Sequence, residues 1–178
     1  MPRAYNRLPN IYADIEDVYG MIQHQVPVFE DSLVMLQHSL DRCRSIHVKE
    51  KYSLKELEKL EALKNRFIRT TNIFLEVFLQ LICKIDGEQM GTIVDQINRA
   101  EKKQIVNKAD DLVELKNLNL DLAQSDFPED LHVYLNLVKE HAPLLFDYFN
   151  GFICYARKRN FYREPERISL NSETFLEK

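Results

Sequence analysis

The stretch SLKELEKLEALKNRFIRTTNIFLEVFLQLICKIDG, residues 53–87, has the pattern of one long amphipathic helix. Ser53 and Glu56 are spaced for a capping box, in which each side chain accepts a hydrogen bond from the backbone amide of the other residue. Gly87 suits the residue just past the helix end. Beyond Ile73 the segment is apolar on nearly all sides, which predicts that its second half lies in the core. The run Thr70-Thr71-Asn72 predicts a bend between the halves.

Four further segments show helical spacing of apolar residues. One begins just after Pro27 and continues to about Ile46, and a short one spans about 92–103. Another is expected to begin at Asn107, a residue suited to capping a helix N-terminus. The last runs from Leu131 to Arg159, with a break or bend expected near His141-Ala142 because Pro143 disrupts helical hydrogen bonding. These patterns predict an all-α, up-down bundle of about five helices.

The domain organisation follows from the same patterns. We expect one helical domain over residues 27–159. We expect residues 1–26 to be an N-terminal extension with a short helix, and residues 160–178 to be a polar C-terminal tail.

The composition excludes several classes of protein. Four glycines in 178 residues are too few for a sandwich or barrel or for a phosphate-cradling loop. The three cysteines are far apart, which favours buried thiols in the reducing cytoplasm, and no His or Cys ligands occur in the close pairs of a zinc site. We therefore predict neither a metal nor a cofactor. No apolar run is long enough to cross a membrane, and a net charge of −4 gives no overall attraction to nucleic acid.

Residues 92–130, TIVDQINRAEKKQIVNKADDLVELKNLNLDLAQSDFPED, resemble the central block of the HEPN-domain family. In that family a short helix with D-x-x-N-R-A-E-K precedes a longer helix that carries an Arg-Asn pair and a His. Asp95, the run 98–102 and the turn at Phe127-Pro128 match this block. Residues 60–63 and Arg66-Phe67-Ile68-Arg69 resemble the family's long second helix. The resemblance covers roughly residues 53–158.

The resemblance implies a small helical bundle that pairs with a second copy. In active members the paired Arg/His motifs cleave RNA without a metal. Other members are non-catalytic partners of small nucleotidyltransferases in toxin–antitoxin-type pairs. In this chain the motif positions hold Asn119, Leu120 and Gln124. Gln124 cannot exchange a proton at neutral pH and Asn119 carries no charge, so we predict no catalytic residues.

Three hypotheses follow for function. The first is a non-catalytic HEPN-like binding protein, homodimeric and paired with a nucleotidyltransferase-type partner or with RNA. The second is an active HEPN ribonuclease toxin whose catalytic groups lie elsewhere in the chain. The third is an unrelated helical protein-interaction module.

Basic and aromatic residues gather near the C-terminus. Such a mixture suits RNA phosphates and stacked bases, so nucleic-acid contact is one interpretation. The alternative is a solvated helix end, where cations are favoured by the helix dipole, and Glu164 and Glu166 dilute the charge. The candidate contact residues are Arg157, Lys158, Arg159, Phe161, Tyr162 and Arg163.

Overall fold

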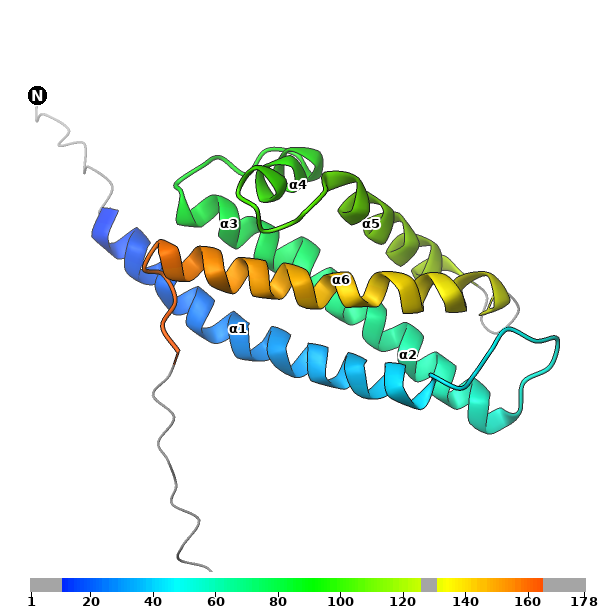
Figure 1. The fold of residues 1–178 in the computed structure, drawn as a ribbon. Coiled ribbons are helices and arrows are strands. Elements are labelled where there is room, and N and C mark those ends of the chain that lie inside the picture. Colours follow the sequence, from blue (N-terminus) through cyan, green and yellow to red (C-terminus); the bar gives the residue numbers. More distant parts are fainter. Residues whose placement is uncertain (1–10, 126–130, 165–178) are drawn as a thin grey trace, which may run out of the picture.

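The computed structural model describes the backbone of residues 11–125 and 131–164 and the side chains of 17–125 and 134–164. Every regular element in these residues is helical (Figure 1). The α-helices are α1 (Ile11–Arg42), α2 (Leu54–Ile73), α3 (Leu79–Ile85), α4 (Ile93–Lys102), α5 (Ala109–Gln124) and α6 (Leu131–Lys158), and a π-helix, η1 (Phe74–Phe78), joins α2 to α3. Because α2, η1 and α3 form one continuous rod, the expected all-α bundle of about five helices is confirmed.

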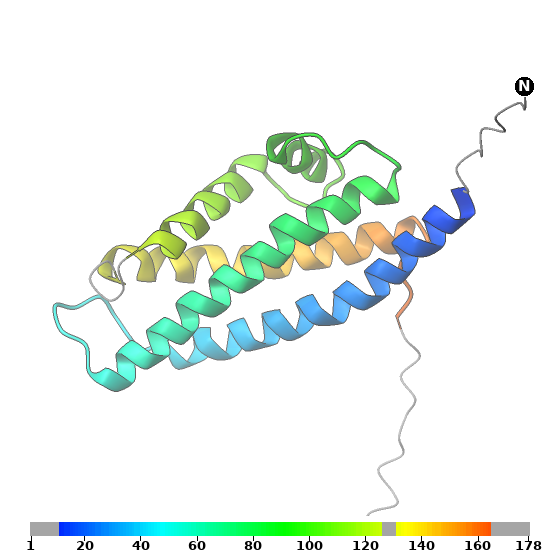
Figure 2. The same ribbon diagram turned by 180° about the vertical axis from the view of Figure 1, so that it is seen from behind.

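The rod packs against α1, α5 and α6, and α1, the rod, α5 and α6 run in alternating directions in chain order (Figures 1 and 2). Its second half supplies Phe74 and Phe78, both fully buried, as the sequence predicts. The Phe78 ring lies 4.7 Å from that of Phe29 in α1 and 4.6 Å from that of Phe152 in α6, measured between ring centroids. An aromatic cluster therefore joins the rod to both neighbours.

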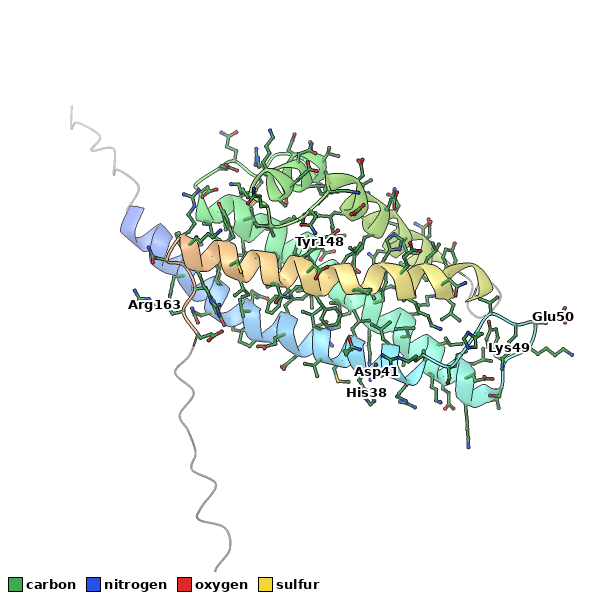
Figure 3. All side chains as sticks on the ribbon, in the orientation of Figure 1. His38, Asp41, Lys49, Glu50, Tyr148 and Arg163 are labelled. Atoms are coloured by element: carbon green, nitrogen blue, oxygen red, sulfur yellow. The ribbon has the colours of Figure 1, made fainter. Side chains whose placement is uncertain are left out.

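Both ends of the rod follow the expected local chemistry. The Ser53 amide donates to the Glu56 carboxylate at 2.9 Å, which completes the capping box. Hydrogen bonds from Lys49, in the preceding loop (Figure 3), and from Ser53 lower the pKa of Glu56 to about 2. At the other end Gly87 adopts a φ of 65°, and the amides of Gly87 and Glu88 bond back to the last turn at 3.1 and 3.0 Å. This pair of bonds is a Schellman motif, which requires the left-handed conformation that glycine adopts easily.

The helix start expected after Pro27 is wrong, because α1 runs unbroken from Ile11 to Arg42 with Pro27 inside it. Pro27 is exposed, so water can satisfy the carbonyl that loses its intrahelical partner. Apolar packing also continues across the proline, since Ile22, Val26 and Phe29 are all buried. The short helix expected within residues 1–26 is thus the first half of α1, and it belongs to the bundle.

Of the break or bend expected near His141-Ala142, the break is wrong, since α6 continues from Leu131 to Lys158 with Pro143 inside it. Pro143 is exposed like Pro27, and its neighbours Ala142 and Leu145 are fully buried. A continuous buried stripe again holds the helix together on both sides of a proline that faces water.

The departure from regular α-helix in the rod comes one turn later than expected. Residues 70–72 remain α-helical, and the wider turn is η1. The expected cap at Asn107 is wrong as well, because α5 begins at Ala109 after Lys108, which makes no side-chain cap. The Ala109 amide instead donates to the Glu101 carboxylate of α4 at 3.0 Å.

Two further expectations, the burial of the cysteines and the polar C-terminal tail, agree with the structure only in part. Cys43 and Cys83 are buried as expected, but Cys154 is exposed, because it lies on the outer face of α6. At the start of the expected polar tail, Phe161 and Tyr162 are partly buried and pack against the core. Residues 165–178 and the Phe127-Pro128 turn lie outside the described residues.

Candidate functional site

The three positions of the family motif point in different directions on α5. Asn119 is only 5% exposed, and its Nδ2 donates to Oδ1 of Asn72 in α2 at 2.7 Å. Leu120 is 46% exposed and Gln124 is exposed, so both face solvent. The structure therefore does not bring the motif side chains together, and Asn119 is used for packing between α5 and the rod.

The Asn119–Asn72 pair belongs to a layer of buried polar groups just before η1. On the α1 side of the rod, Ser32 Oγ and Thr70 Oγ1 lie 2.6 Å apart, and both residues are buried. Thr70 also donates to the Arg66 carbonyl at 2.8 Å. Since a hydroxyl has one proton, Ser32 must donate to Thr70 when Thr70 donates to Arg66.

Two hydroxyls deeper in the core have no hydrogen-bond partner among the described residues, Thr71 Oγ1 and Tyr148 OH. Tyr148 is labelled on α6 in Figure 3, and burial raises the pKa of its hydroxyl. Asn119 Oδ1 also lacks a partner within the described part of the chain. These groups make polar packing contacts, but none of them can supply a positive charge or transfer a proton at neutral pH.

In α4, the residues that match the family block make hydrogen bonds to the loops next to that helix. Asp95 forms a capping box with Thr92, whose amide donates to Asp95 Oδ2 at 2.8 Å. Bonds from the Thr92 backbone and hydroxyl lower the pKa of Asp95. Arg99 donates to the carbonyls of Gln89 and Met90, which closes the α3–α4 loop. The matching sequence thus has a structural explanation in this chain.

The C-terminal basic cluster gathers at the end of α6, but part of it is already engaged. Arg157 pairs with Glu164, and its guanidinium lies 5.7 Å from the Tyr162 ring centre. Arg159 lies 3.3 Å from Asp86 Oδ1. Lys158 and Arg163, the latter labelled in Figure 3, are both exposed, and neither makes an ion pair or side-chain hydrogen bond within residues 17–125 and 134–164. Only these two cations are therefore available without breaking an internal contact.

The backbone amide of Phe161 helps to cap the C-terminal end of α6. Its amide donates to the Ala156 carbonyl at 2.9 Å, and Asn160 before it has a φ of 62°. This is a second Schellman motif, with Asn160 in the position usually held by glycine. Nucleic-acid contact by this cluster remains a prediction.

A more deeply buried charge cluster, which sequence reasoning missed, joins three helices at one corner of the bundle. We call Asp86, Lys103, Tyr155 and Arg159 the Asp86 cluster. The Asp86 carboxylate is 11% exposed and accepts hydrogen bonds from Lys103 Nζ and the Tyr155 hydroxyl. Burial alone would raise the pKa of Asp86, but the bonds from Lys103 and Tyr155 outweigh it and lower that pKa.

The Asp86 cluster could be found only in part from the sequence. Gly87 marks Asp86 as the cap of the rod, but nothing local indicates that Lys103 and Tyr155 meet there. Lys103 pairs with Asp86 and also lies 3.0 Å from Glu88, so the buried charges have partners inside the molecule and the cluster acts as a structural clamp.

Two kinds of site are not formed by the described residues. No group of three or more His, Cys, Asp or Glu side chains among them could hold a metal ion. In the same part of the chain, no helix is both long and apolar enough to cross a membrane.

Comparison of the chain with protein-family models, curated proteins and solved structures gave no match. The HEPN resemblance therefore stays a prediction, and the case for function depends on the site itself.

Proposed function

We propose that this chain is a non-catalytic, HEPN-like helical binding protein that acts as a homodimer and pairs with a small nucleotidyltransferase in a toxin–antitoxin-type system. The supporting observation is the place of Asn119, whose side chain is buried against Asn72 where the family pattern puts its arginine. An arginine at this position would bury a charged guanidinium against the uncharged side chain of Asn72, and burying a charge without a charged partner is costly.

The lack of an imidazole and a guanidinium at the motif positions of α5 supports the non-catalytic part of the proposal. RNA cleavage of the family type needs an imidazole to move a proton and a guanidinium to hold the phosphate. Gln124 is exposed on α5 but has no pKa near neutral pH, and Leu120 beside the buried Asn119 is apolar. At its motif positions the helix can therefore contribute contacts but not the imidazole and guanidinium chemistry of the active family members.

Leu120 supports the homodimer part of the proposal. Its side chain is 46% exposed on the helix that carries the pairing face in the family. An exposed leucine alone is ordinary, but here it lies where the resemblance implies a second copy. Burying it between two copies would remove apolar surface from water and favour pairing.

A ribonuclease assay tests the non-catalytic assignment. Purified protein should leave structured and single-stranded RNA intact, and His47→Ala and His132→Ala should change nothing. Cleavage by the wild-type chain that is lost in either variant would support the active ribonuclease toxin instead.

Light scattering over a range of concentrations tests the homodimer. Leu120→Glu should shift the protein towards monomer, because it places a charge on the proposed contact. Val34→Glu is the matched control, since Val34 is 62% exposed on α1, away from α5. A wild-type chain that stays monomeric throughout would favour the unrelated interaction module.

Co-purification with a nucleotidyltransferase encoded by a neighbouring gene would test the partner directly.

RNA is the second proposed partner, and Lys158 and Arg163 are its contacts. An RNA titration across salt concentrations should show affinity falling as salt rises, because phosphate contacts release counterions. The double variant Lys158→Gln/Arg163→Gln should make that dependence shallower. An affinity that does not change with salt would exclude these phosphate contacts.

A further inference from the structure

A hollow of about 140 Å³ opens between α1 and α2, on a face that neither the motif helix nor the basic cluster occupies. The two helices lie side by side along this seam in both views (Figures 1 and 2). The volume far exceeds the roughly 15 Å³ that one water requires, so a small polyatomic ion fits. Its lining residues are Asp31, Ser32 and Met35 of α1 and Arg66 and Arg69 of α2.

Hydrogen-bond donors line the α2 side of the hollow. Arg66 is held in place because its Nη1 donates to the Met35 carbonyl at 3.2 Å and to Ser39 Oγ at 2.5 Å. Its other N–H groups have no recorded partner in the described part of the chain. Arg69 lies one turn further along α2, is exposed, and likewise has no recorded partner among the described residues. Two guanidinium groups are thus available, one of them pre-positioned.

Hydrogen-bond acceptors line the α1 side. When Thr70 donates to the Arg66 carbonyl at 2.8 Å, Ser32 must donate to Thr70 at 2.6 Å, and the Ser32 oxygen is left to accept. Asp31 is exposed, and within the described residues it forms no ion pair with Arg66 or Arg69. A carboxylate and two guanidinium groups therefore line one hollow without neutralising each other through direct contact.

From this arrangement we infer that the α1–α2 hollow binds a protonated phosphate group, as inorganic phosphate or as a phosphate monoester. Phosphate oxygens would accept from Arg66 and Arg69, since guanidinium matches oxyanion geometry in two-pronged hydrogen bonds. The P–OH group would donate to the Asp31 carboxylate or to Ser32. Sulfate has the same shape but carries no proton near neutral pH, so Asp31 repels it. This inference is independent of the proposed function.

Calorimetric titration of the full chain at pH 6 and constant ionic strength tests the site. Inorganic phosphate should bind at millimolar concentrations or below, and sulfate should bind at least tenfold more weakly. Titration with glycerol 3-phosphate shows whether the site prefers a phosphate monoester to inorganic phosphate. The comparison is possible at this pH because about half of a monoester is protonated near pH 6. Tighter binding of either phosphate compound supports the site and identifies the source, whereas equal binding of sulfate and phosphate overturns the inference.

Two variants connect binding to the named residues. Arg69→Gln should weaken phosphate binding roughly tenfold, because it removes a charged donor. Arg44→Gln is the matched control and should leave binding unchanged, because the Arg44 side chain is 84% exposed and lies just beyond the C-terminal end of α1. Asp31→Asn should bring sulfate affinity up towards that of phosphate. Unchanged phosphate binding in Arg69→Gln, or unchanged selectivity in Asp31→Asn, would overturn the assignment.

Discussion

The Asp86 cluster and the α1–α2 hollow both place a carboxylate near two cations, yet they differ in how those charges are paired. In the cluster Lys103 and Tyr155 donate directly to an Asp86 side chain that is 11% exposed. In the hollow Asp31 is exposed and makes no ion pair with Arg66 or Arg69 among the described residues.

The difference distinguishes a structural use of charge from a binding use. Charges removed from water must be compensated within the protein, and removing one partner leaves the other uncompensated. Charges that keep access to water need no internal partner and can exchange water for a ligand. Substitutions at the corner near the Asp86 cluster should therefore change stability, and substitutions of the exposed Asp31 and Arg69 in the hollow should change binding alone.

The largest effect is expected for Gly151→Ala in α6, near the same corner. An added Cβ would lie 2.4 Å from the Ile105 carbonyl oxygen, which is backbone and cannot move aside alone. The variant should lose about 3 kcal/mol of unfolding free energy in urea denaturation.

Gly20→Ala is the matched control for that substitution. Gly20 lies inside α1 with nothing within 4 Å of an added Cβ, so the variant should gain about 0.5–1 kcal/mol from its higher helix propensity. Equal effects of the two alanines would show that α6 does not approach Ile105 closely.

The second effect is expected for Asp86→Asn. Lys103 would keep Glu88 at 3.0 Å but lose its buried partner, at a cost of about 2 kcal/mol in unfolding free energy. Asp121→Asn makes the same charge change at an exposed position of α5 and should cost little. A similar stability for both variants would contradict the structural role of the cluster.

A pH series sharpens the same point. Because the pKa of Asp86 is lowered in the folded state, this carboxylate stabilises the fold above the unfolded-state pKa of about 3.9. The contribution is lost as the pH falls through the lowered folded-state pKa. Below about pH 4 the wild-type chain should lose stability more steeply than Asp86→Asn, as followed by circular dichroism in urea. Parallel curves would mean that the Asp86 pKa is the same in both states.

The smallest effect is expected in the hollow. Arg69→Gln and Asp31→Asn should each change the unfolding free energy by less than about 0.5 kcal/mol. Both side chains are exposed, and neither forms an ion pair with another described residue. Thermal unfolding without phosphate measures this. A loss above about 1 kcal/mol would give these charges a structural role as well.

The sequence predicted the features that depend on neighbouring residues. The capping box at Ser53 and Glu56 and the helix end at Gly87 follow from local chemistry, and both are confirmed. Pro27 and Pro143 were misjudged because the cost of a proline depends on whether its helix face meets water, which only the packed fold decides.

Contacts between distant residues account for what the sequence could not predict. Glu101 caps α5 from eight residues upstream, and the partners of Asp86 come from two other helices. For the candidate site, the sequence identified Asn119 as a position that differs from the family pattern. Its contact with Asn72, 47 residues earlier, required the fold.

The π-helix η1 makes the bundle sensitive to the length of one short segment. A residue rotates an α-helix by about 100°, so deleting one residue between Phe74 and Phe78 would turn α3 by about that angle relative to α2. Different side chains would then meet α4, although the amino-acid composition of the core would hardly change. In this segment, inserting or deleting one residue should therefore disturb the packing of the bundle more than most substitutions do.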